Sequence, residues 1–173
     1  MHIRDARPAD LPALLAVHLD AFGDEGPAIA RLVQDLFADE TAQPLLALVA
    51  ETEGRVVGNV IFSAVHIVGA EDLSAFILAP LAVAPGAQRA GIGRALVEAG
   101  LEASRQHGAH LAFVLGDPGY YGRFGFTPRH RVRAPHELPY PEAWMALALQ
   151  DGALDRASGR LACARCLGAP EYW

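Results

Sequence analysis

The chain has 173 residues, of which 52% are apolar and 20% charged, a composition typical of one globular domain over 1–173 and not of a disordered chain. All of its basic residues are arginine and the formal net charge is −6, so it offers no basic stripe to the phosphates of a nucleic acid. No apolar window reaches the roughly 18 residues of a membrane span and the first residues do not resemble a signal peptide, so we expect a cytoplasmic protein with no membrane and no nucleic-acid partner.

The first part of the chain predicts one strand and two helices. A short strand is expected at 2–6 and a helix at 8–22, where a proline occupies the first helical position. The acidic loop 23–26 then leads to a second amphipathic helix at 27–37. His18 lies on the apolar face of the first helix, and a hydrogen-bonded core histidine is favoured there over a ligand.

The middle of the chain changes from helical to strand periodicity. Strands at 45–53, 55–68 and 72–84 are separated by short connections, which indicates an antiparallel meander. A strongly periodic helix follows at 92–107, and an apolar strand at 110–116 comes after it. The strand-helix-strand order predicts that this last strand runs parallel to the third strand of the meander.

The final third gives weaker signals. Asp117 is suited to cap a short helix that carries Tyr120 and Tyr121. Gly125-Phe126 is expected to start another strand, and the last clear strand covers 142–150. The remainder, 151–173, is rich in glycine and alanine and predicts no definite element.

Two cysteines lie in this last segment. Cys163 and Cys166 form a C-x-x-C pair, which is typical of a redox centre or of half a zinc site. No second Cys/His pair stands nearby to complete four zinc ligands, and cytosolic thiols remain reduced. The sequence therefore favours two free cysteines and no metal.

The segment 81–94 has the chemistry of an anion site. A strand passes through Pro85-Gly86 and a Gln-Arg-x-Gly-x-Gly turn straight into a helix. The first amides of a helix have no internal acceptor and the helix dipole is positive there, so such a turn suits phosphate. A P-loop would need a lysine and a dinucleotide fingerprint would stand at the first strand-helix turn, so neither applies.

The order β-α-α-β-β-β-α-β-α-β, with this turn after the fourth strand, resembles the GCN5-related N-acetyltransferase (GNAT) superfamily. The family's acetyl-CoA motif, [Gln/Arg]-x-x-Gly-x-[Gly/Ala], stands at 88–93, and its Tyr-x-[Lys/Arg]-x-Gly-Phe segment stands at 121–126. The stretch 114–126 is similar to the YhbS-like bacterial branch. The resemblance covers about 2–150 and implies an α+β fold with a mixed central sheet flanked by helices, and acetyl-CoA as co-substrate without a metal.

The resemblance also implies roles for individual residues. Strand residues before the turn would pair with the pantetheine amides, and turn residues would hold the pyrophosphate: Leu81, Ala82 and Val83 for the first, and Gln88, Arg89, Ala90, Gly91, Ile92, Gly93 and Arg94 for the second. Tyr121 would be the general acid that protonates the CoA thiolate. The alternatives are a plain packing turn for the glycines and an aromatic packing role for Tyr121. Tyr120 is expected in the core or in the wall of the acceptor pocket.

The base that deprotonates the acceptor amine is not identified by the sequence. Asp24, Glu25, Glu51 and His66 are candidates, but solvated or structural roles are more common for such groups. The alternating arginines at 129–133 could meet an acidic acceptor or the CoA 3′-phosphate, although a solvated strand face is favoured.

The sequence thus predicts an acetyl-CoA-dependent N-acetyltransferase that acts by direct attack in a ternary complex. O-acyl transfer, a longer acyl group and a noncatalytic acyl-CoA sensor remain as alternatives. The expected partner is a small-molecule or peptide amine, and both a monomer and a homodimer are open.

Overall fold

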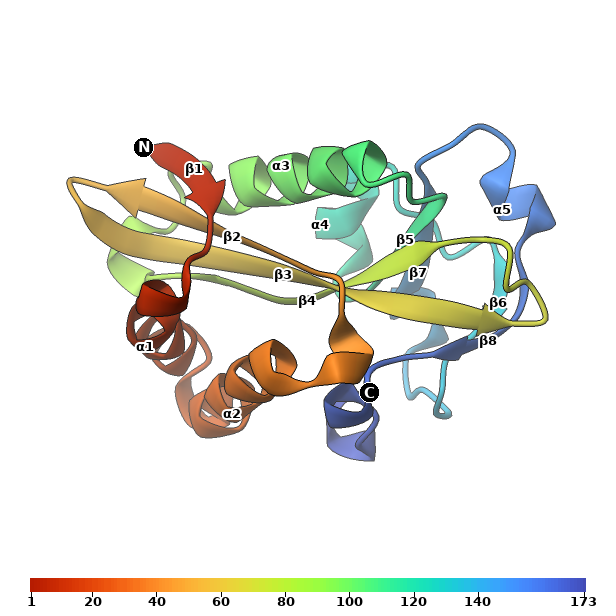
Figure 1. Cartoon of the computed structure of the whole chain (residues 1–173), viewed down its shortest axis with the longest axis horizontal. Coiled ribbons are helices and arrows are strands. Elements are labelled where there is room, and N and C mark those ends of the chain that lie inside the picture. Colours follow the sequence, from red (N-terminus) through yellow and green to blue (C-terminus); the bar gives the residue numbers. More distant parts are fainter.

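The elements are arranged on a mixed β-sheet that runs through the molecule (Figure 1). The computed structural model describes residues 1–173. Its strands are β1 (His2–Asp5), β2 (Leu45–Thr52), β3 (Arg55–Val68), β4 (Ala75–Val83), β5 (Leu111–Leu115), β6 (Arg131–Arg133), β7 (Trp144–Ala148) and β8 (Ser158–Ala162). Its α-helices are α1 (Leu11–Ala21), α2 (Gly26–Ala38), α3 (Ile92–Gln106), α4 (Pro118–Tyr121) and α5 (Ala153–Arg156).

The main path of the sheet follows the order β1-β2-β3-β4-β5-β7. Along this path only β4 and β5 are parallel, and every other neighbouring pair is antiparallel. The predicted meander of β2, β3 and β4 and the predicted parallel crossover through α3 are both confirmed. The chain therefore has the expected mixed sheet flanked by helices.

Helices cover both faces of this sheet. Figure 1 shows α1 and α2 on one side and α3 and α4 on the other. Alternate residues of a strand point to opposite faces, so Ile61 joins the core under α1 and α2 while its neighbour Phe62 joins the core under α3. Gly100 has no Cβ, which lets α3 approach the sheet closely. A Cβ at this position would lie only 2.1 Å from a ring carbon of Phe62. None of the helices combines the length and the apolar composition needed to cross a bilayer.

Some predicted boundaries were too wide. β4 and β7 lie inside the expected ranges 72–84 and 142–150, and Pro141–Ala143 form a 3-10 turn before β7. The expected strand start at Gly125-Phe126 is wrong, because Gly125 takes a left-handed φ of 97°. Only Thr127 then pairs, in a single bridge with Ala146.

The segment 151–173 folds back onto the rest of the chain. β8 pairs with the distal end of β3, where Val68 lies opposite Arg160, and also with β6. The chain then returns beside α2, where the Cys166 N–H donates to an Asp39 carboxylate oxygen at 3.0 Å. This return places Tyr172 near the N-terminal end of α2, where its hydroxyl donates to the Ala28 carbonyl.

Candidate active site

β4 and β5 are paired at one end and separate at the other. Their pairing begins at Ala75 opposite Leu111 and ends at Leu78 opposite Val114. β4 continues through Pro80, which has no N–H, and residues 81–83 remain paired with β3 on their other edge. The edge of 81–83 that faces away from β3 therefore has no strand partner.

The turn after β4 presents a run of backbone N–H groups. No amide of residues 88–94 donates to a backbone carbonyl, and Ala95 is the first that does so, to Gly91 at 3.0 Å. Arg89 and Gly91 take left-handed φ values of 64° and 80°. For an arginine this conformation costs about 1 kcal/mol or more, and such strain clusters at functional sites. Together with the positive end of the α3 dipole, the turn is built to bind an anion.

A groove of about 470 Å³ lies along this turn, and we call it the cofactor groove. Most of the residues predicted to bind acetyl-CoA line it: Leu81, Val83, Gln88, Arg89, Gly91, Ile92, Gly93 and Arg94. Ala82 is buried beneath it, and Ala90 is exposed outside its lining. A Cβ at Gly93 would lie 3.0 Å from the Tyr120 hydroxyl, so any larger residue there would enter the groove.

Two side chains of the turn have partners within the protein. The Gln88 amide donates to the Val83 carbonyl at 3.1 Å. Arg94 pairs with Glu98, four residues later on α3, at 2.9 Å. The backbone amides and the exposed guanidinium of Arg89 are thus the groups in this turn that are left without a partner.

Tyr120 does not occupy the place expected from the sequence. It is half-buried and lines the cofactor groove, together with Arg123, and it does not line the acceptor side. Successive residues of a helix point about 100° apart, so Tyr120 and Tyr121 face different cavities.

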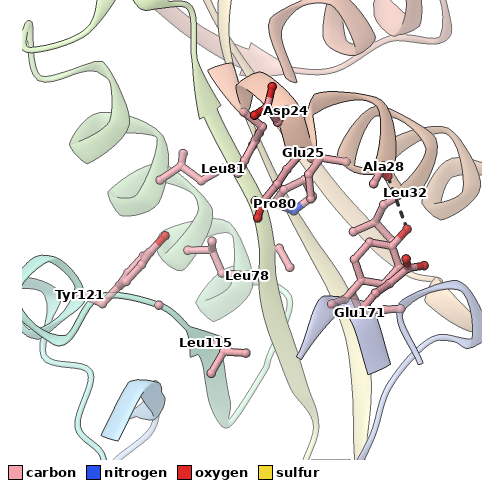
Figure 2. A pocket seen from close by; sticks show the side chains of 16 residues that line it. Asp24, Glu25, Ala28, Leu32, Leu78, Pro80, Leu81, Leu115, Tyr121 and Glu171 are labelled. Carbon is pink, nitrogen blue, oxygen red and sulfur yellow. Dashed lines mark hydrogen bonds between the residues drawn. The ribbon is translucent and has the colours of Figure 1, made fainter. Parts of the chain in front are cut away.

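A second cavity, of about 650 Å³, is lined by residues on both sides of the middle of β4, and we call it the acceptor cavity (Figure 2). Its walls come from the turn between α1 and α2, from α2, from the middle of β4, from the end of β5, from α4 and from the last residues of the chain. Leu81 lines both this cavity and the cofactor groove. The two spaces therefore meet at the point where β4 separates from β5.

Tyr121 reaches into the acceptor cavity from α4. Its ring lies against the backbone of Gly116, where a Cβ would be 2.5 Å from a ring carbon, and it packs edge-on against Phe126. In Figure 2 its hydroxyl points toward Leu78 and Leu81. Burial, and secondly the neighbouring Tyr120, raise the pKa of Tyr121 above its ordinary value. The phenol is thus a protonated hydrogen-bond donor at the junction of the two cavities.

The sequence matches the family model of the acetyltransferase (GNAT) domain over residues 2–129. The chain belongs to the GNAT acetyltransferase family. Membership identifies it as an acyltransferase, and it explains why a strand that separates from its parallel neighbour is followed by a turn rich in free amides.

Several relatives extend this similarity over nearly the whole chain. The uncharacterized N-acetyltransferases YjhQ and YhbS of Escherichia coli K12 are 37% and 39% identical, over 94% and 92% of this chain and 91% and 93% of their own lengths. The crystal structure of Escherichia coli YhbS in complex with CoA superimposes with a TM-score of 0.88 at 34% identity, covering 98% of this chain and 92% of that one. A GNAT acetyltransferase from Brucella melitensis in complex with acetyl-CoA gives 0.77 at 33% identity, covering 96% and 97%. The similarity to the YhbS-like branch is confirmed.

The candidate bases of this GNAT acetyltransferase fall in different places. Asp24 and Glu25 line the acceptor cavity. Glu51 instead pairs with Arg4 at 3.0 Å on the first two strands, and His66 is exposed on the distal half of β3. Of the four candidate bases, only Asp24 and Glu25 therefore line this cavity.

Other candidate groups lie outside both cavities. Arg131 and Arg133 are exposed on β6. Cys163 and Cys166 are free thiols, and burial, followed by the nearby Asp39, raises the pKa of Cys166 to about 12. Neither cysteine lines the acceptor cavity or the cofactor groove.

A buried polar pair lies beside the part of β4 that carries Leu81. His18 is fully buried, and its Nε2 lies 2.7 Å from the Asn59 side-chain oxygen. The Asn59 amide donates to the Leu48 carbonyl at 2.8 Å, and Asn59 sits opposite Ala82 in the sheet. The prediction of a hydrogen-bonded core histidine is confirmed. Burial lowers the pKa of His18, so the ring stays neutral.

The C-terminal wall of the acceptor cavity was missed by the sequence analysis. Leu167, Glu171 and Tyr172 line the cavity, and the Tyr172 hydroxyl donates to the Ala28 carbonyl of α2 at 3.4 Å. One signal was available: β3 is 14 residues long, far longer than β2 and β4, so its distal half required another strand partner.

Proposed function

We propose that this GNAT acetyltransferase moves an acetyl group from acetyl-CoA directly to an amine while both substrates are bound. The observation that carries the proposal is that the cofactor groove and the acceptor cavity are separate spaces that meet at Leu81. Each substrate can occupy its own space, and the thioester and the amine can meet at the junction. Holding two reactants in this way supplies a large part of the rate enhancement.

The cofactor groove supports acetyl-CoA as the donor. The free amides of residues 88–94 would bind the pyrophosphate, and the unpaired edge of residues 81–83 would pair with the pantetheine amides. Two structural relatives, YhbS and the Brucella melitensis protein, are complexes with CoA and acetyl-CoA respectively. These relatives have the fold of this chain over nearly its full length.

The acceptor cavity supports the chemical step. The amine loses a proton to water or to Asp24 or Glu25, and its nitrogen forms a bond to the acetyl carbon. The carbon–sulfur bond then breaks, and Tyr121 gives its proton to the CoA thiolate before regaining one from solvent. The raised pKa of Tyr121 keeps the phenol protonated but makes it a weaker acid, so much of its effect on the thiolate comes from the hydrogen bond that it donates to the sulfur. No covalent enzyme intermediate is needed in this sequence.

The test combines acetyl-CoA binding with turnover. Acetyl-CoA should raise the melting temperature, because it stabilises the native state by mass action, and CoA release should depend on an added amine. Tyr121→Phe should keep the thermal shift and lower kcat by about 100-fold, the low end of general acid catalysis. Tyr140→Phe is the matched control, because Tyr140 is 68% exposed and lines neither cavity.

The possible outcomes separate the alternatives. No thermal shift at millimolar acetyl-CoA would contradict the proposal as a whole. Binding without turnover for any amine would indicate an acyl-CoA sensor, and turnover that requires an alcohol or a longer acyl-CoA would indicate a different transferase. Full activity of Tyr121→Phe would remove the general-acid role and leave the direct transfer.

A further inference from the structure

The acceptor cavity carries more negative charge than a proton transfer requires. Three of its lining residues are carboxylates, Asp24, Glu25 and Glu171, and none is arginine, lysine or histidine. One carboxylate or a water molecule is enough to accept the proton of the attacking amine. The other carboxylates belong to no ion pair of the protein, so they are free to bind a ligand.

These carboxylates come from two segments that are distant in the sequence. Asp24 and Glu25 belong to the turn between α1 and α2, whereas Glu171 belongs to the returning C-terminal segment. In Figure 2, Tyr121 lies at one side of the cavity and Glu171 at the other, with β4 between them in the view. The reacting end and the Glu171 end of the cavity are thus different places.

The segment that carries Glu171 is fixed in position. The Trp173 indole N–H donates to the Leu167 carbonyl at 2.8 Å, and Leu167 itself is only 3% exposed. His136 bonds to the Gly168 carbonyl at 2.7 Å. Glu171 therefore belongs to a segment that is held against the rest of the protein by hydrogen bonds and forms part of the cavity wall.

The space between the two ends is apolar. Leu32, Leu78 and Leu167 line it and are each 3% exposed. A hydrocarbon chain that enters this space would remove its apolar surface from water without desolvating a polar group of the lining. The cavity thus offers a hydroxyl donor at one end, an apolar middle and a carboxylate at the far end.

We propose that the acceptor is an amine with a second, positively charged group, joined by an apolar chain, and that Glu171 binds this second group. This inference rests on the proposed function. The reacting amine must be neutral to attack, whereas a distant alkylammonium with a pKa of about 10.4 stays charged at neutral pH. Asp24, Glu25 and Glu171 are exposed, so the attraction of this group to Glu171 is that of a surface ion pair, and the other two carboxylates add to it.

The test measures binding to the CoA-loaded protein, so that it does not depend on turnover. The probes are a linear diamine, the amino alcohol of the same length and the amino acid of the same length, followed by calorimetry. We expect the diamine to bind about 3-fold to 5-fold more tightly than the amino alcohol, the upper range of an exposed ion pair, and the amino acid to bind least. Glu171→Gln should reduce the diamine preference by at least about 2-fold, and Glu142→Gln, an exposed change outside the cavity, should retain it.

Two results would overturn the inference while the proposed function stands. One is equal binding of the diamine and the amino alcohol by a protein that still binds acetyl-CoA. The other is an unchanged diamine preference in Glu171→Gln, whatever Asp24→Asn does, with the acetyl-CoA thermal shift of each variant showing that it is folded. Failure of acetyl-CoA binding in the unmodified chain would instead count against the proposed function itself.

Discussion

The cofactor groove and the acceptor cavity lie on either side of Leu81, and they are built in opposite ways. One contiguous stretch, 81–94, supplies most of the groove, which presents free backbone amides and whose charged side chains are all arginines. The acceptor cavity is assembled from distant segments, and its charged side chains are all acidic. The signs of charge match an anionic cofactor and a cationic acceptor.

This difference predicts which amino-acid substitutions each space tolerates. A site made of backbone amides keeps its donors when side chains change, but it fails when added volume blocks the approach of the ligand. A site made of side chains keeps its shape when one charge is removed, but its selectivity changes. The predictions below test this contrast between backbone and side-chain recognition.

The largest effect is expected when a side chain is added in the groove. Gly93→Val should weaken acetyl-CoA binding by at least about 100-fold, because its Cβ would lie 3.0 Å from the Tyr120 hydroxyl and its methyl groups would fill the groove. Calorimetry with acetyl-CoA measures the change, and circular dichroism checks the fold. Gly86→Val is the control, since a Cβ there meets nothing within 4 Å. Equal affinity of both variants would place the pyrophosphate elsewhere.

The second effect concerns the buried pair of His18 and Asn59 beside β4. Asn59→Ala removes the partner of His18 and of the Leu48 carbonyl in a fully buried place, so the free energy of unfolding should fall by about 2–4 kcal/mol. Urea denaturation measures this loss. Gln106→Ala, at an exposed site of α3, should stay within about 0.5 kcal/mol of the unmodified chain. A loss below 1 kcal/mol for Asn59→Ala would mean that water satisfies His18.

A smaller effect, of opposite sign, is expected from Glu98. This exposed carboxylate holds Arg94 at 2.9 Å, at the mouth of the groove. Glu98→Gln should free Arg94 for the phosphates and strengthen acetyl-CoA binding by about 2-fold to 5-fold, the range of a surface ion pair. The gain should disappear at high salt, where exposed charges are screened. Weaker binding in this variant would show that Glu98 orients Arg94 and does not compete for it.

The smallest expected effect is that kcat stays nearly constant as the pH rises into the alkaline range. Because the pKa of Tyr121 is raised, its proton stays bound as the pH rises through the ordinary tyrosine value of about 10. With both substrates saturating and an acceptor amine whose pKa lies below about 8, kcat should therefore change less than about 2-fold from about pH 8 to about pH 11. A descending limb in this range that is absent in Tyr121→Phe would assign Tyr121 an ordinary pKa.

Sequence reasoning was strongest where the structure is local. The strand before the turn, the free amides and the α3 helix follow from adjacent residues, and β4 and α3 lie where periodicity placed them. The acceptor cavity depends on pairs such as Tyr172 and Ala28, which are 144 residues apart. No periodic pattern links such residues, because the return of the chain depends on the pairing of β8 with the long β3.

The unexpected position of Tyr120, which lines the cofactor groove and not the acceptor cavity, has a similar physical origin. Two adjacent tyrosines on a four-residue helix give no periodicity from which to choose the inward face. The choice is made by Gly116, whose missing Cβ makes room for the ring of Tyr121. The capping of the same helix by Asp117 was predictable, because an aspartate acts on the amide two residues later and needs no distant partner.

The placement of the tyrosines gives the protein a set of internal spectroscopic labels. Of its four tyrosines, Tyr120 lines the groove, and Tyr121 and Tyr172 line the acceptor cavity. Tyr140 is exposed to solvent and lines neither space. Uniform replacement by fluorotyrosine would therefore yield fluorine resonances for each compartment together with a built-in reference. Titration with one substrate at a time would then reveal the order of binding without any change to the sequence.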